Sequence, residues 1–500
     1  MTRKFAFLSI MVGGLMVVFA ACGPAAAPTA APATAPPEAT EAPAATMAPT
    51  EAPTEAPPML SGDVTRGGRL YDKWTEELGV DVPDGNHPLW AAQSTNTRTG
   101  ADTWRCKECH GWDYKGVDGA YSSGSHKTGF KGVMGMSGKD PNEILAILKG
   151  SMNPDHDFSL YMDEQALIDL SLFLSTELMD YSALIHLDKS LVGGDAEAGQ
   201  SFFDEVCADC HGPQGLALNF GNAAEPEYQG SIAVDNPWEF VHKMRFGQPA
   251  FPAMPSLADD GVTMETYADV LAYAATFPTA SPVTEGGVLY DNWMKALGVE
   301  APATDQPLFA TQSTNTRTGA DTWRCKECHG WDYKGADGAY SSGSHMTGFG
   351  GVFEASALSA EDLTAWLTGG KNPDHNFAGE GLMGEDQIGM LVAFLQAPKV
   401  DVGTFINADK TITGGDPANG EDIFSGLCRD CHGDDGKALN FGDEAEPEYL
   451  GTIAVDNPWE LVHKVTYGQP GAVMPSGHNM AWTLQDIIDI LAFVQTLPVE

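Results

Sequence analysis

The hydrophobic positions of this chain fall into short amphipathic stretches, separated by segments rich in Gly, Pro, Asn and Thr. Apolar residues that recur every three to four positions indicate a helix with one buried face. The pattern predicts helices at 67–78, 163–174, 196–206, 266–276, 286–297, 385–395, 420–427 and 484–497. Two further helices are expected at 238–246 and 459–467, each followed by a Gly-Gln-Pro turn. The sequence therefore predicts an all-α protein.

The first 60 residues have a different composition. Residues 1–21 combine Arg3 and Lys4 with an apolar run at 5–19, and small residues precede Cys22. This order is typical of an export signal and resembles a bacterial lipoprotein signal, which implies a lipid on Cys22. Residues 23–60 are mostly Ala, Pro, Thr and Glu, too few of them apolar for a folded core. We expect a signal peptide at 1–22, a disordered linker at 23–60, and a lipid-anchored protein on the extracytoplasmic face of the cell membrane.

The rest of the chain is an internal duplication. Residues 93–116 are identical to residues 312–335, and the sequence at 232–239 recurs at 453–460. Each half contains two unlike segments, so the order is A-B-A′-B′. We expect module A at 61–183, module B at 184–280, module A′ at 281–402 and module B′ at 403–500.

Each of the four segments contains one Cys-x-x-Cys-His sequence. Two thiols and a His at this spacing are the attachment signature of c-type haem, in which the thiols bond the porphyrin and the His binds the iron. Eight of the nine cysteines are used in this way, and the ninth is Cys22. The expected haem-binding residues are Cys106, Cys109 and His110; Cys207, Cys210 and His211; Cys325, Cys328 and His329; Cys428, Cys431 and His432. We therefore expect four covalently bound haem c groups.

With these motifs and flanking helices, residues 61–500 resemble a multihaem, tetrahaem cytochrome c of the class I kind. The resemblance implies four all-α modules, each around one haem, and a second iron ligand opposite the His. That ligand is usually a Met in a loop before the last helix. In the B modules Met254 and Met474 fit, since each begins a Met-Pro-Ser sequence in that loop. His242 and His463, on the preceding helix, are expected to have a structural role.

The second iron ligand of the A modules has three candidate pairs, one residue from each copy. They are Met162 and Met383; His156 and His375; and His126 and His345. The Met pair directly precedes the last helix and keeps its place although the copies differ by a two-residue insertion. We favour this pair and expect each Met to face the motif His. The second pair, in Asn-Pro-Asp-His, is the alternative, and the third lies too close behind the haem motif.

The formal net charge is −42, from 69 acidic and 27 basic residues. Nucleic-acid binding needs a basic surface, so this charge excludes it. It suits redox partner proteins that have a basic docking patch. If every iron has two axial ligands, none is open to a substrate, and we expect an electron carrier without catalytic activity. The alternative is a multihaem oxidoreductase acting on a small inorganic substrate at a module A haem.

Overall fold

The computed structural model describes residues 59–251, 254–379 and 381–499, and residues from 59 onward form one compact unit. In these residues the regular structure is helical, with isolated β-bridges and no strands. The all-α prediction is therefore confirmed. No helix in this part of the chain is long and apolar enough to cross a membrane. The expected signal, Cys22 and the linker up to residue 58 lie outside the described residues.

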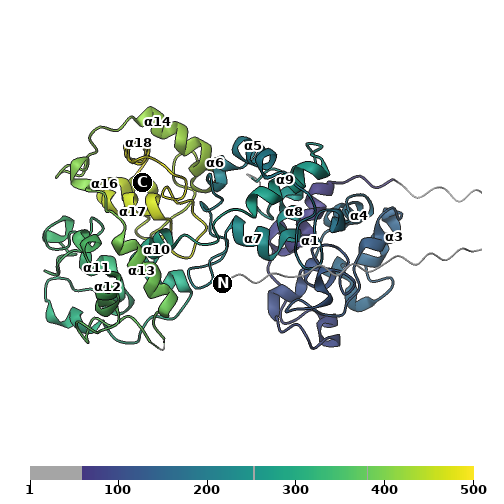
Figure 1. The fold of residues 1–500 in the computed structure, drawn as a ribbon, viewed down its shortest axis with the longest axis horizontal. Helices are drawn as coiled ribbons and strands as arrows, with labels where there is room; N and C mark the ends of the chain where they lie inside the picture. Colours follow the sequence, from purple (N-terminus) through teal and green to yellow (C-terminus); the bar gives the residue numbers. More distant parts are fainter. Residues whose placement is uncertain (1–58, 252–253, 380, 500) are drawn as a thin grey trace, which may run out of the picture. The chain divides into compact units, whose positions relative to one another are not determined.

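Modules A and A′ have the same set of helices (Figure 1). In module A they are α1 (Val64–Leu78), α2 (Cys106–His110), α3 (Pro141–Leu148) and α4 (Glu164–Thr176). In module A′ they are α10 (Pro282–Leu297), α11 (Cys325–His329), α12 (Ala360–Leu367) and α13 (Glu385–Gln396). The short helices α3 and α12 were not among those expected from the sequence. They pack against α4 and α13, the last helices of their modules.

Modules B and B′ also share their helices. In module B they are α5 (Ala196–Val206), α6 (Ala208–His211), α7 (Gln229–Asp235), α8 (Pro237–Phe246) and α9 (Met264–Ala274). In module B′ they are α14 (Pro417–Ile423), α15 (Arg429–His432), α16 (Leu450–Asp456), α17 (Pro458–Tyr467) and α18 (Leu484–Val494). The helix expected at 420–427 is divided, because a π-helical turn at Phe424–Cys428 follows α14.

In every module the first helix packs across the last helix, and a glycine lies at the crossing. A Cβ atom added to Gly199 would lie 2.0 Å from the carbonyl oxygen of Asp269. Cβ atoms added to Gly67, Gly286 and Gly420 would lie 2.3, 2.1 and 2.0 Å from the matching carbonyl oxygens. No side chain fits at these distances, so each crossing requires glycine. The A modules thus share the helical frame of the B modules despite their longer loops.

A buried histidine joins the two modules of each half. His242 on α8 of module B has no exposed surface. Its Nδ1 lies 2.8 Å from the hydroxyl oxygen of Tyr114, and its Nε2 donates to the carbonyl oxygen of Gly68 at 3.0 Å; both partners belong to module A. His463 repeats these contacts at 2.7 and 2.9 Å. The expected structural role of both histidines is confirmed, and each half folds as an A–B pair.

A buried carboxylate lies in the same interface. Asp291 of α10 accepts from Arg324 of its own module at 2.5 Å and from Lys464 of module B′ at 2.7 Å. Burial alone would raise the pKa of Asp291, but the charges of Lys464 and Arg324 outweigh it and lower that pKa to about 2. Asp72 occupies the matching position in the first half, with one Arg and one Lys as its partners.

Candidate haem sites

The Cys-x-x-Cys-His motifs lie on the short helices α2, α6, α11 and α15. In the A modules a backbone carbonyl fixes the motif His. The Nδ1 atoms of His110 and His329 lie 2.7 Å from the carbonyl oxygens of Lys131 and Gly350. A carbonyl only accepts, so Nδ1 carries the proton and Nε2 is left for a metal. Burial lowers the pKa of both imidazoles to about 4, which keeps them neutral, as a metal ligand must be.

Beside α2 lies a cavity of about 370 Å³. Cys106, Cys109 and His110 line one side of it, and His156 lines another. Most of the remaining wall is apolar and includes Trp104, Ile144, Leu148, Phe158, Leu170 and Leu174. Three imidazoles, those of His87, His110 and His156, border this apolar space with the two thiols. Two thiols and two imidazoles in apolar surroundings are what a covalently attached haem with two His ligands requires.

His156 and His110 face each other across this cavity. Their ring centres are 6.2 Å apart with an interplanar angle of 71°, and those of His375 and His329 are 6.1 Å apart at 66°. A metal–nitrogen bond is about 2 Å, and the ring centre lies about 1 Å beyond the nitrogen, so two imidazoles on one metal have centres about 6 Å apart. The separation in both copies therefore fits one iron held by two imidazoles.

This geometry favours His156 and His375 over Met162 and Met383 as the groups opposite the motif histidines, and the identity of the second ligand stays a prediction. Met162 does not line the cavity; it lies in the hydrophobic core with only 4% of its surface exposed, and Met383 is 1% exposed. Asp163 caps α4 by accepting from the amide of Ala166 at 2.8 Å. Met162 is therefore the apolar residue just before a helix cap, a position that packs inward. In module A′ the N-cap residue is Gly384, which has no side chain to form such a cap, and Met383 is buried all the same.

His156, the last residue of an Asn-Pro-Asp-His sequence, lines the cavity, although we had expected it to lie outside the pocket. The Asn153 side chain accepts from the Asp155 amide at 3.0 Å, which closes a 3-10 turn ending at His156. In the second copy, the Nδ1 of His375 donates to the carbonyl oxygen of Trp366 at 3.0 Å, which again leaves Nε2 for a metal. The Asn-Pro-Asp-His tetrapeptide, identical in both copies, is the sequence signal for this histidine.

His126 and His345 do not reach the cavity. The Nδ1 of His126 lies 3.1 Å from Oε1 of Glu108, the residue between the two motif cysteines. Asn96 donates to the same oxygen at 2.8 Å, and Glu108 has no exposed surface. Burial alone would raise the pKa of Glu108, but the hydrogen bond from His126 and the charge of Lys107 hold it well below its usual value. Asn96 and His126 thus hold Glu108, and with it the haem motif, by hydrogen bonds.

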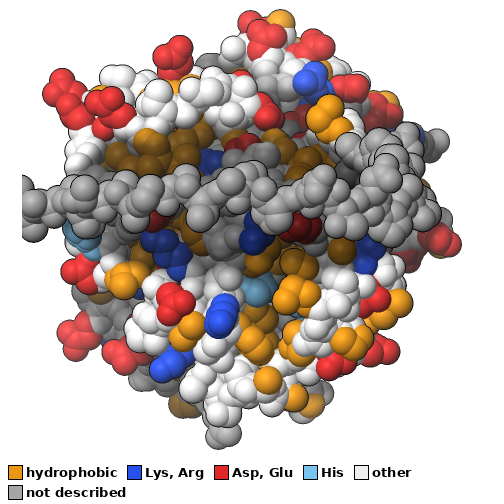
Figure 2. All heavy atoms as spheres, turned by 90° about the vertical axis from the view of Figure 1, so that its right-hand side faces the viewer, with side chains coloured by type: hydrophobic (Ala, Val, Ile, Leu, Met, Phe, Trp, Pro, Cys, Tyr) orange, Lys and Arg blue, Asp and Glu red, His pale blue; other side chains and the backbone are white. Residues whose placement is uncertain are grey.

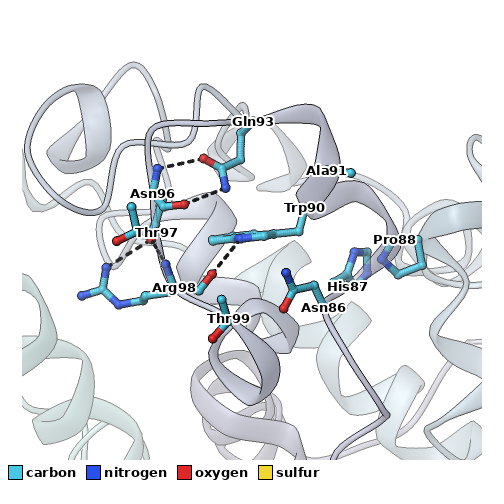
Figure 3. A pocket seen from close by; sticks show the side chains of 10 residues that line it. All are labelled: Asn86, His87, Pro88, Trp90, Ala91, Gln93, Asn96, Thr97, Arg98 and Thr99. Carbon is cyan, nitrogen blue, oxygen red and sulfur yellow. Dashed lines mark hydrogen bonds between the residues drawn. The ribbon is translucent and has the colours of Figure 1, made fainter.

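The loop between α1 and α2 is held together by hydrogen bonds among its own residues (Figure 3). Gln93 accepts from the Asn96 amide at 2.8 Å, and Trp90 donates to the carbonyl oxygen of Arg98 at 3.0 Å. These residues and His87 line an open polar hollow of about 420 Å³. His87 also lines the haem cavity, where its ring centre lies 6.2 Å from that of His156. Sequence comparison of the copies missed His87, because Gln306 occupies its position in module A′.

In the B modules the structure places the motif histidines and the expected methionines on different segments. Burial lowers the pKa of His211 to about 4 and also lowers that of His432. Their Nδ1 atoms are buried and make no hydrogen bond to the described residues. Met254 and Met474 are half-buried in the loops that follow α8 and α17. Their ligation of iron stays a prediction from the sequence.

Residues 194–273 and 415–494 match the family model of cytochrome c oxidase, cbb3-type, subunit III. Each matched stretch extends from the helix before a haem motif into the last helix of a B module. The matched parts of modules B and B′ are therefore similar to a c-type cytochrome. The two matches support covalent haem c and a haem-based redox function. The division into four modules stays an interpretation, since modules A and A′ lie outside the matched stretches.

No curated protein matches the sequence. Among solved structures, the chain is similar to the as-isolated form of thiosulfate dehydrogenase (TsdBA) from Marichromatium purpuratum, with 16% identity. The match covers 86% of this chain and 90% of that chain, with a TM-score of 0.19. A score this low assigns neither a site nor a substrate. The similar protein is nevertheless an enzyme. This finding corrects our expectation of an electron carrier without catalytic activity. The haem motifs alone do not imply that catalytic activity is absent.

Proposed function

We propose that this chain is a tetrahaem electron-transfer protein in which each of the four modules holds one covalent haem c. The facing imidazoles of His110 and His156, repeated by His329 and His375, carry the proposal. Two fixed ligands on one iron suit single-electron transfer, because the iron need not change its ligands when its charge changes. The apolar cavity walls exclude water and let ligand type and burial set the potential.

The two kinds of module have different ligands in this proposal. The A modules use two imidazoles, and the B modules use His211 with Met254 and His432 with Met474. A Met ligand raises the potential of a haem relative to a second His. We therefore expect the B haems to be reduced before the A haems in a potentiometric titration.

The surroundings of the protein follow from charge and from the N-terminal segment. We propose that a lipid on Cys22 and the linker at 23–60 hold the folded unit at the extracytoplasmic face of the membrane. Figure 2 shows acidic side chains around the edge of one face, with hydrophobic side chains exposed between them. Together with the net charge of −42, this surface supports redox partner proteins with a basic docking patch.

The full-length protein tests the proposal directly. Intact mass should fit four haem additions, and a basic redox protein should oxidise the reduced chain at a rate that falls as salt rises. Carbon monoxide should leave the reduced spectrum of the A haems unchanged, because no axial position is open. Fewer than four additions, or rapid carbon monoxide binding by half of the haem, would contradict the proposal.

A further inference from the structure

The loop that contains Met474 in module B′ is hydrogen-bonded to module B. The Ser476 amide donates to the carbonyl oxygen of Ala217 at 3.1 Å. The Ala217 amide donates to the carbonyl oxygen of His211 at 3.0 Å, and His211 is the motif histidine of module B. A short run of backbone hydrogen bonds thus leads from the haem motif of B to the residue two positions after the expected Met ligand of B′.

The side chain of Asn479 completes this contact. Its Nδ2 donates to the carbonyl oxygen of Leu216 at 2.7 Å, and its Oδ1 accepts from Ser281 at 2.7 Å and from Thr284 at 3.0 Å. The matching residue in the first half is Asp259, whose carboxylate accepts from a threonine of α1 at 2.8 Å. A carboxylate has no N–H to donate. The contact with module B therefore depends on the amide that only the second copy has.

Burial of the loop that follows the haem motif differs between the two copies. Leu216 is 7% exposed and Ala217 is 2% exposed. The matching Ala438 is exposed, and Leu439 is 44% exposed where Leu218 of the first copy is half-buried, although both copies have the sequence Ala-Leu-Asn-Phe. The loop from module B′ accounts for the difference, because it covers the first copy.

Within each half, the segment after the haem motif of A contacts the helix before the Met loop of B. The ring centre of Trp112 lies 5.0 Å from that of His242, and Trp331 lies 5.1 Å from His463. These contacts place A beside B and A′ beside B′. The junction of residues 211–217 with residues 474–479 places B beside B′.

We infer that the haem sites of B and B′ are direct neighbours, so that electrons pass in the order A–B–B′–A′ and not in the order of the sequence. This inference rests on the proposed function. Each step moves one electron, which oxidises the donor site and reduces the acceptor site without a proton or a co-reactant. The two Met-ligated sites then lie in the middle and the two bis-His sites at the ends, so the central pair holds the first two electrons.

The replacement of Asn479 by Ala tests the junction, and Asp259→Ala is the matched control. Both variants lose a hydrogen bond to the first helix of an A module, but only Asn479→Ala also loses the hydrogen bond to the Leu216 carbonyl. Hydrogen exchange measured by NMR should speed up about tenfold at the Ser476 amide in the first variant, the factor that one hydrogen bond supplies. Exchange at that amide should be unchanged in the control. If the Ala variant does not fold, Asn479→Asp takes its place in the experiment, because the first half of the chain already has Asp at the matching position, Asp259.

Electron exchange is measured on partly reduced protein by exchange spectroscopy of the Met254 and Met474 methyl signals. The wild type should show cross-peaks between oxidised and reduced forms of both, and the Asn479 variants should lose them while retaining four haems. A Ser476 amide that exchanges freely in the wild type would overturn the junction. Unchanged cross-peaks in a variant with a freely exchanging Ser476 would overturn the route. In both cases, an intact set of four haems would leave the proposed function standing.

Discussion

Replacement of His156 by Ala tests the assignment of the iron ligands in module A. In the structure the ring centre of His156 lies 6.2 Å from that of His110, and we propose that each imidazole supplies one nitrogen to the iron. Alanine ends at Cβ, so the variant removes this nitrogen from the far side of the cavity. The chain has four haem motifs, so the variant should open one site in four.

Carbon monoxide titration of the reduced protein measures this opening. About one quarter of the total haem should become reactive in His156→Ala, and about one half in the double variant with His375→Ala. Met162→Ala is the control, since it removes a core side chain that is 4% exposed. It should lower the free energy of unfolding by about 2–5 kcal/mol without creating a reactive haem. Carbon monoxide binding in the Met162 variant, with none in the His156 variant, would refute the assignment.

Three further predictions concern the frame and the modules. Gly199→Ala should lower the free energy of unfolding by about 1–3 kcal/mol because its Cβ would meet a carbonyl oxygen at 2.0 Å; the exposed helical Gly389, with no atom near its Cβ, should gain about 0.5–1 kcal/mol from the same change. The lowered pKa of Asp291 contributes about 2 kcal/mol that is present above pH 4 and lost as pH falls towards 2. In Asp291→Asn, acid unfolding should no longer show that component. The variant should also be less stable at pH 7, because Lys464 and Arg324 lose the carboxylate that lies between them. Cys207→Ala should remove one haem by mass and leave three, and loss of all haem would show that the modules do not fill independently.

Helix positions could be predicted because they depend on local signals. The apolar period and the flanking Gly and Pro residues located α5 at its observed bounds and α1 to within three residues at its start. The short helices α3 and α12 were missed, since eight residues give too little periodicity to stand out.

The ligands across the cavity could not be settled by the same means. Met162 keeps its register with α4 because the core needs an apolar residue there, and ligation would have given the same pattern. What separates the two candidate ligands is the distance between His110 and His156, and only the folded chain brings these two residues together. The B–B′ contact is harder still, because Asn479 and Leu216 are 263 residues apart. The copies differ at both residues of this contact, since Asp259 matches Asn479 and Lys437 matches Leu216.

The buried contacts of His242 also limit how this chain can be dissected. A fragment containing module A alone would leave the Tyr114 hydroxyl and the Gly68 carbonyl without their partner, and Asp72 without Lys243. A fragment containing module B alone would expose the imidazole and the aromatic residues around it. Expression of single modules should therefore give poorly soluble products, and the shortest piece that retains its own interior is half of the chain. The segment duplicated in the sequence thus coincides with the smallest piece that can fold.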